Sequence, residues 1–275
     1  AIRLYNADCL IVLPELEQGS VDCIFTDPPY GHNNNNGDLI HRREAALGRL
    51  PCGETSPLEA RPIANDGPEA NEVYRQVLPL MFHVLSPGCC CCCCCCGGGG
   101  PDPQFARWSL WMDEVFSFKQ MVVWDKGQMG MGWHYRRSYE TVLVGEKPGA
   151  ACRWYGGHDK ENIIRPNSYG IHKIIPSADE HPTEKCFELA AHFLRLHTQP
   201  GDVVADPFMG QASTAIAAIR LGRKFVGIEV DADHFLASVS KIESELCRFP
   251  LLESPSKQKQ VSLFKEECNV STDAD

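Results

Sequence analysis

Residues 202–231 read DVVADPFMGQASTAIAAIRLGRKFVGIEVD, and this stretch decides the fold. A short apolar run ends in Asp206 and is followed by a loop that contains Gly210. A pattern of helical period comes next, and a second apolar run then ends in Glu229. Strand, tight turn, helix and strand, with an acid about 20 residues after the turn, form a βαβ unit that binds nucleotides. In such units the acid holds ribose hydroxyls, and we expect this role for Glu229.

A second signature lies near the start of the chain, where TDPPY at residues 26–30 closes the apolar stretch 21–25. Neither proline has an N–H to continue a ladder or a helix, and each pushes the residue before it toward extended backbone. The carboxylate, the carbonyl oxygens and the tyrosine ring therefore project from the end of a strand. Two acceptors for an amino group beside a ring that stacks on a flat base suit an amino-methyltransferase that acts on a nucleobase.

Together, these signatures resemble the DNA amino-methyltransferases that use S-adenosylmethionine, in the β arrangement, where the catalytic motif precedes the cofactor loop. The resemblance extends from Ile2 to Leu246. Residues 6–10 are similar to the family segment that contacts the cofactor's adenine, and residues 181–185 to the segment that cradles its methionine moiety. The chain departs from the family where Ala212 replaces the second glycine of the cofactor loop.

The resemblance implies an α/β fold of the Rossmann-like methyltransferase type, with a mixed, mostly parallel, seven-stranded sheet and helices on both faces. The expected catalytic domain covers residues 1–249. Within it, residues 31–68 are predicted to be a mobile loop that faces DNA, and residues 147–180 a small target-recognition region. Residues 250–275 are acidic and poor in apolar periodicity, and we predict a disordered tail there.

The resemblance also assigns the site residues. The expected catalytic residues are Asp27, Pro28, Pro29 and Tyr30. The expected cofactor-binding residues are Asp8, Cys9, Lys185, Asp206, Phe208, Gly210, Ser213, Thr214, Glu229 and Val230. The expected DNA-binding residues are His41, Arg42, Arg43, Arg136 and Arg137. No metal site is expected.

In the implied reaction, S-adenosylmethionine methylates the exocyclic N6 of an adenine that is flipped out of DNA. Asp27 and the carbonyl of Pro28 would each accept one N–H of the amine, while Tyr30 stacks on the base. Adenine is favoured over the N4 of cytosine, because cytosine enzymes more often carry serine where Asp27 stands. Double-stranded DNA is the expected partner, a homodimer is left open, and the expected location is the cytoplasm of a bacterial or phage-infected cell. Restriction, protection and regulation all remain open as roles.

The formal net charge of −10 opposes DNA binding, because phosphate contacts dominate affinity. Basic residues nevertheless gather locally at 41–43 and 134–137, so a basic face on an acidic protein is the expected solution. No window holds about 18 uninterrupted apolar residues, and no membrane span is expected.

Cysteine makes up an uninterrupted run from Cys89 to Cys96, out of 15 cysteines in the chain. Adjacent strand residues point to opposite faces, so the run does not suit a tetrahedral zinc site. Buried thiols pack as small apolar groups, and the run stands where the fold requires a central strand. We therefore predict a buried strand.

Three rival functions remain. One is an RNA or protein methyltransferase with similar tetrapeptide chemistry, which the order of the two motifs opposes. Another is a catalytically silent DNA-binding module, suggested by Ala212 and the acidic charge. The third is a nicotinamide-dependent dehydrogenase, suggested by the βαβ unit alone, which leaves residues 27–30 unexplained.

Overall fold

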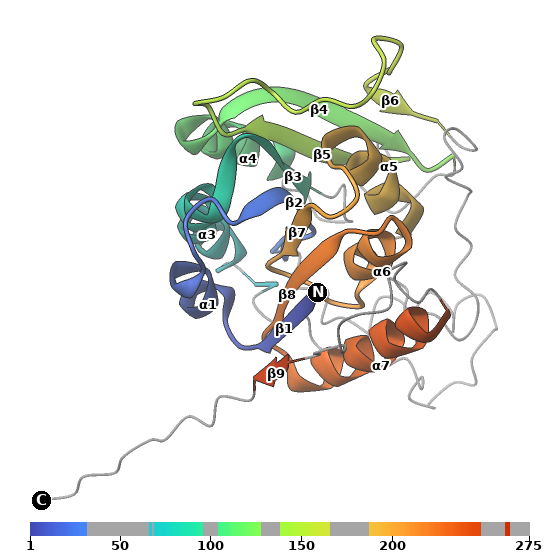
Figure 1. The fold of residues 1–275 in the computed structure, drawn as a ribbon. Helices are drawn as coiled ribbons and strands as arrows, with labels where there is room; N and C mark the ends of the chain where they lie inside the picture. Colours follow the sequence, from blue (N-terminus) through green and yellow to red (C-terminus); the bar gives the residue numbers. More distant parts are fainter. Residues whose placement is uncertain are drawn as a thin grey trace, which may run out of the picture.

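A computed structural model describes residues 1–31, 66–67, 69–95, 104–127, 138–165, 187–248 and 262–264 of the 275-residue chain (Figure 1). Its strands are β1 (Ile2–Asn6), β2 (Val21–Thr26), β3 (Leu85–Cys95), β4 (Ser117–Asp125), β5 (Tyr139–Glu146), β6 (Ile163–Ile164), β7 (Val203–Asp206), β8 (Lys224–Glu229) and β9 (Ser262–Phe264). Its helices are α1 (Cys9–Glu15), α3 (Ala70–Val84), α4 (Gln104–Val115), α5 (Phe187–His197), α6 (Ser213–Arg220) and α7 (Ala232–Arg248).

All of these strands belong to one sheet, in the order β6-β4-β5-β3-β2-β7-β8-β1-β9. The prediction of a mixed, mostly parallel sheet is confirmed, but the predicted number of seven strands is wrong, since the described part of the sheet has nine. The two extra strands are β6 at one edge and β9 at the other, and each is too short to form an apolar run in the sequence. β9 pairs with β1 and lies inside residues 250–275, for which the sequence predicts disorder.

The strand directions define two further borders of the sheet, one at the carboxyl ends of the parallel strands and one at their amino ends. β3, β2, β7, β8 and β1 run parallel to one another, whereas β5 is antiparallel to both β3 and β4. Residues at the last positions of β2, β7, β8 and β1 therefore meet at one edge, here called the carboxyl edge. The pair Asp125 and Tyr139, where β4 ends and β5 begins, also lies toward this edge.

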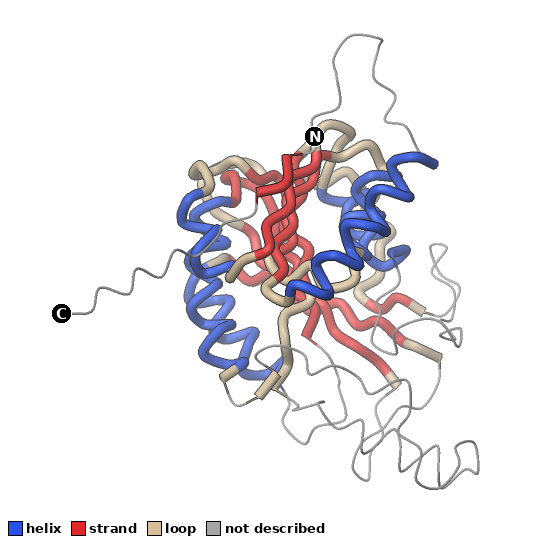
Figure 2. The backbone as a smooth tube through the Cα atoms, turned by 90° about the horizontal axis from the view of Figure 1, so that it is seen from below, coloured by secondary structure: helices blue, strands red, loops and turns tan. Residues whose placement is uncertain are grey.

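Helices cover both faces of the sheet, as Figure 1 shows and as Figure 2 shows from below. One face packs against α1, α3 and α4, and the opposite face against α5, α6 and α7. The sheet is thus the middle of three layers, and its central strands are buried on both sides.

The prediction of a buried strand is confirmed for the described part of the cysteine run, because residues 89–95 form most of β3, while Cys96 lies outside the described residues. Cys90, Cys92 and Cys94 face the layer of α5 and α6, while Cys89, Cys91 and Cys93 face the layer of α3 and α4. All six side chains are at most 3% exposed. Small thiols on both faces let helices pack closely on the strand.

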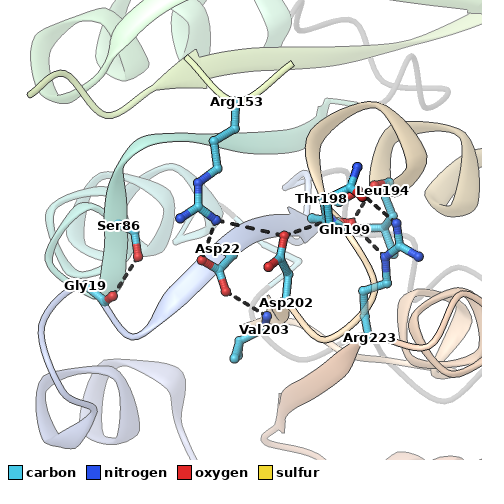
Figure 3. A network of polar contacts seen from close by, with 10 residues as sticks. All are labelled: Gly19, Asp22, Ser86, Arg153, Leu194, Thr198, Gln199, Asp202, Val203 and Arg223. Atoms are coloured by element: carbon cyan, nitrogen blue, oxygen red, sulfur yellow. Dashed lines mark hydrogen bonds and ion pairs between the residues drawn. The ribbon is translucent and has the colours of Figure 1, made fainter. Parts of the chain in front are cut away.

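At the opposite, amino edge of the sheet, Arg153 joins the starts of two central strands (Figure 3). Its Nη1 lies 2.7 Å from an oxygen of Asp22 and 3.9 Å from one of Asp202. The other oxygen of Asp22 accepts the backbone N–H of Val203 at 2.9 Å. These contacts hold the segment after β5 against the starts of β2 and β7.

Arg153 belongs to the predicted target-recognition region at 147–180, so its ion pairs fix the position of the start of that region. Its first residues lie at the amino edge, where Lys147 also donates to the carbonyls of Phe82 and Leu85 at the end of α3. The chain returns to the far end of β4 only at β6, where Ile164 pairs with Trp124. The described start of that region is therefore part of the scaffold.

The described ranges contain no helix that is both long and apolar enough to cross a membrane.

Burial of the cysteine strand predicts its reactivity. In native protein at pH 8, brief treatment with a thiol reagent should label the exposed Cys152 and Cys247 and spare Cys89–Cys94. Desolvation raises the pKa of Cys89 to about 12, so its thiolate fraction at pH 8 is on the order of 10⁻⁴. Peptide mass spectrometry measures the labelling site by site. Labelling of Cys89–Cys94 at the rate of Cys152 in folded protein would overturn the assignment of β3 to the core.

Candidate functional site

The carboxyl edge brings together site residues that are far apart in the sequence. Asp27 follows β2, Asp206 ends β7, Glu229 ends β8 and Asp8 follows β1. Because the strand order is β2-β7-β8-β1, these carboxylates follow one another along the edge. The chain leaves β2 toward β3 and leaves β7 toward β8, in opposite directions along the sheet. Open α/β sheets bind ligands at such a switch point.

A buried hydrogen bond joins the two motifs. Thr26 Oγ1 donates to Asp206 Oδ1 at 2.7 Å, and both residues are at most 3% exposed. The same oxygen of Asp206 accepts the N–H of Phe208 at 3.1 Å. The last residue before Asp27 is therefore bonded to Asp206, the first residue of the predicted cofactor loop at residues 206–214. This role of Thr26 was not predicted, although the sequence places its hydroxyl side chain directly before the acid.

Asp206 carries its carboxylate in an environment that disfavours charge. Burial raises the pKa of Asp206 to about 6, and the nearby carboxylate of Glu229 also raises it. Hydrogen bonds from Thr26, Thr214 and Phe208 lower this pKa but do not cancel the effect of burial. Within the described ranges, neither Asp206 nor Glu229 forms an ion pair. Two buried carboxylates close together suit a ligand that brings positive charge.

Glu229, which is expected to hold ribose hydroxyls, also fixes the loop that contains Gly210. One carboxylate oxygen accepts the N–H of Gly210 at 2.8 Å, and the other accepts the N–H of Asp231 at 2.9 Å. Each carboxylate oxygen has a second lone pair, which leaves an acceptor for a hydroxyl such as those of a ribose. The next residue, Val230, exposes its apolar side chain at the same edge.

Residues of α7 and β8 contact the predicted cofactor loop and hold it in place. Ser238 of α7 donates its hydroxyl to the carbonyl of Gly210. Lys241 of the same helix donates to Gln211 Oε1 at 3.0 Å. Gly227 of β8 lies so close to Met209 that an added Cβ would come within 2.4 Å of the sulfur. The path of the loop thus depends on a glycine in the neighbouring strand.

Ala212 has a left-handed backbone, with φ of 67° and ψ of 23°, directly before α6. It is the one residue other than glycine with positive φ among the described residues. Glycine adopts this region freely, whereas a Cβ costs about 1–2 kcal/mol there. The family departure noted in the sequence therefore has a backbone cost. The methyl group itself is fully buried in the core beneath the loop.

At the other end of the row, Asp8 is the N-cap of α1 and accepts the N–H of Leu10 at 2.8 Å. The turn before it is held to β8, since Asn6 Nδ2 donates to the carbonyl of Glu229 at 2.9 Å. Cys9, also assigned to the cofactor, buries its side chain in the core, and desolvation raises its pKa to about 12.

The tetrapeptide leaves β2 with Pro28 buried and with Asp27, Pro29 and Tyr30 partly exposed. The Tyr30 ring lies 6.1 Å from the ring of Trp108. The N–H groups of Tyr30 and Gly31 donate to one oxygen of Asp66, a residue that the sequence analysis did not single out.

Six expected site residues lie outside the described residues, so their roles stay predictions. They are His41, Arg42, Arg43, Arg136, Arg137 and Lys185.

Comparison with known proteins gives a family and a fold. Residues 21–240 match the model of a family described as DNA methylase. The chain is 23% identical to the type II methyltransferase M2.DpnII of Streptococcus pneumoniae, over 88% of this chain and 90% of that protein. It is also 23% identical to the DNA adenine methyltransferase YhdJ of Escherichia coli K12, over 88% of this chain and 83% of that one.

Among solved structures, the chain resembles TTHA0409, a putative DNA modification methylase from Thermus thermophilus solved with S-adenosyl-L-methionine. The TM-score is 0.62 at 20% identity, over 90% of this chain and 96% of the other. This likeness confirms the predicted Rossmann-like methyltransferase fold.

The strained backbone at Ala212 predicts an unusual response to glycine. Ala212→Gly removes a buried methyl worth about 0.8 kcal/mol but also relieves about 1–2 kcal/mol of left-handed strain, so stability should change by less than about 1 kcal/mol. Ala217→Gly, at an equally buried site inside α6, is the control and should cost about 2 kcal/mol through lost burial and helix propensity. Chemical denaturation measures both, and equal losses would contradict strain at Ala212.

Proposed function

Because the chain belongs to the DNA methylase family, we propose that it transfers a methyl group from S-adenosylmethionine to the exocyclic N6 of an adenine in double-stranded DNA. The observation that carries the proposal is the Thr26–Asp206 hydrogen bond, which sets Asp27 beside the predicted cofactor loop. The adenine specificity named for the relative YhdJ agrees with aspartate at position 27.

The residues of the carboxyl edge fit S-adenosylmethionine, which supplies a methyl group already activated by its sulfonium charge. The buried carboxylates of Asp206 and Glu229 suit a cationic ligand, because charge on the ligand offsets the cost of their burial. Glu229 keeps acceptors for ribose hydroxyls, and Val230 offers an exposed apolar surface beside them.

The tetrapeptide fits the other substrate. The lone pair of an exocyclic amine is delocalised into its ring, so the amine is a poor nucleophile. Asp27 and the carbonyl of Pro28 would each accept one N–H, which aims the lone pair away from the ring plane. Tyr30 would stack on the base, which must leave the duplex to reach this site. Positioning of this kind supplies much of a transfer rate.

In this proposal, the phosphates of the DNA backbone are contacted by the basic side chains of His41, Arg42, Arg43, Arg136 and Arg137. The last two precede Tyr139, whose pairing with Asp125 lies toward the carboxyl edge. Charge concentrated at that edge would allow an acidic protein to bind phosphates.

A methyl-transfer assay on unmethylated genomic DNA, with nucleoside analysis of the product, tests the proposal. Asp27→Ala should abolish formation of N6-methyladenine and leave the affinity for S-adenosylmethionine nearly intact, because Asp27 holds the target amine. Calorimetric titration measures that affinity.

Asp22→Asn is the matched control, since Asp22 lies on the same strand but at the amino edge (Figure 3). This variant should keep its activity. An active Asp27→Ala enzyme would contradict the mechanism, and N4-methylcytosine as the product would replace adenine by cytosine as the target.

The raised pKa of Asp206 predicts how binding depends on pH. A cationic ligand binds the ionised carboxylate, so the affinity for S-adenosylmethionine should fall as the pH drops through about 6, approaching tenfold per pH unit. In Asp206→Asn, binding should be weak and nearly independent of pH between 5 and about 7.5.

Folding provides a second readout of the same carboxylate. Because the folded-state pKa of Asp206 lies above its unfolded value, this group makes the free protein less stable as the pH rises from about 4 to above 6. Asp206→Asn should therefore melt at a higher temperature than wild type at pH 8. A flat pH profile of binding in the wild type would contradict the role of Asp206 as the ligand's counter-charge.

A further inference from the structure

One carboxylate oxygen holds the backbone at both sides of Tyr30. Asp66 Oδ1 accepts the N–H of Tyr30 at 3.0 Å and the N–H of Gly31 at 2.9 Å. These two N–H groups belong to the two planar peptide units that flank the Tyr30 Cα. Fixing both units to a single atom fixes both backbone dihedrals of Tyr30.

The local sequence prepares this arrangement. Directly after these two N–H groups the chain turns at Gly31, whose left-handed φ of 73° suits glycine. Pro28 and Pro29 have their φ angles set by their rings. Asp66 thus does for Tyr30 what the rings do for the prolines, and the backbone is constrained from Pro28 through Gly31.

Asp66 is only 2% exposed, although it is a charged residue. A carboxylate that accepts two backbone N–H groups gains stronger hydrogen bonds than a neutral acceptor would give. A buried acid held this way is a built part of the structure.

The ring of Tyr30 is supported separately, through Trp108 of α4. The two ring centroids are 6.1 Å apart, with planes tilted by 37°. Trp108 is fully buried, stacks on Tyr74 at 3.9 Å and donates its Nε1–H to Asn71 at 2.9 Å. The Tyr30 ring therefore lies beside a fully buried and hydrogen-bonded side chain, while the backbone that carries the ring is held by Asp66.

We propose that Asp66 is a positioning residue for methyl transfer, which sets the orientation of Tyr30, and so of the stacked base, through two backbone hydrogen bonds. The inference rests on the proposed function, in which Tyr30 stacks on the target base. Asp66 itself touches neither the base nor the cofactor in this scheme, so its loss should affect the transfer rate more than cofactor binding.

The test compares Asp66→Ala and Asp66→Asn with wild type in the full-length protein. Asn keeps an oxygen that accepts both N–H groups, whereas Ala removes it. Asp202→Ala is the control, because Asp202 also accepts a backbone N–H, from Gln199 at 2.8 Å, but at the amino edge (Figure 3). Steady-state kinetics use tritiated S-adenosylmethionine and unmethylated genomic DNA, below the unfolding temperature of every variant.

For Asp66→Ala we expect kcat to fall on the order of 10²-fold, with KM for S-adenosylmethionine changed by less than about threefold. Asp66→Asn should recover most of the rate, and Asp202→Ala should keep the wild-type kcat while melting at a lower temperature. Hydrogen exchange of the peptide that contains Tyr30 and Gly31 should accelerate in Asp66→Ala and stay protected in Asp66→Asn.

Two results would overturn the positioning role while leaving the proposed function intact. One is an unchanged kcat in Asp66→Ala beside an active wild type, and the other is an equal loss of kcat in Asp66→Ala and Asp202→Ala. A wild-type protein that binds S-adenosylmethionine but methylates no DNA would instead contradict the proposed function itself.

Discussion

The site depends on the parallel pairing of β2 with β7, which the 2.7 Å bond from Thr26 to Asp206 completes at the carboxyl edge. This pairing brings a tetrapeptide from the start of the chain to a loop that lies 180 positions later. Everything else in the row follows from it, since β8 and β1 continue the sheet from β7. The pairing of β2 with β7 therefore places the tetrapeptide at residues 27–30 next to the loop that begins at Asp206.

The sequence predicted what is local. Strand β7, helix α6 and strand β8 each carry their own periodicity, and the cysteine run was predicted as a buried strand because thiols pack as small apolar groups. The roles of Thr26 and Asp66 were not predictable, because each depends on a partner that the fold alone brings near. The edge strands β6 and β9 were not predicted for another reason: segments of two or three residues are too short to show a periodic pattern of apolar residues. The predicted number of strands was therefore wrong, although the mixed, mostly parallel sheet was predicted correctly.

The buried carboxylates of the site lower the stability of the free protein. Asp206 and Glu229 are buried without an ion pair among the described residues, so the free protein bears a desolvation cost at neutral pH. Backbone N–H groups of the cofactor loop offset part of that cost. The binding edge is thus less stable than an apolar one would be, in agreement with the general cost of preparing a site for a charged ligand.

Asp66 also closes a ring in the chain. Gly31 and Asp66 are joined by a 2.9 Å hydrogen bond, which holds together two positions that are 35 residues apart in the chain. The entropy of closing such a ring grows only with the logarithm of its length, and each doubling costs about 0.6 kcal/mol. A change in the number of residues between these two positions would therefore add little to the cost of holding them together. In evolutionary terms, Asp66 would let the length of the intervening sequence vary while the backbone at Tyr30 keeps its place.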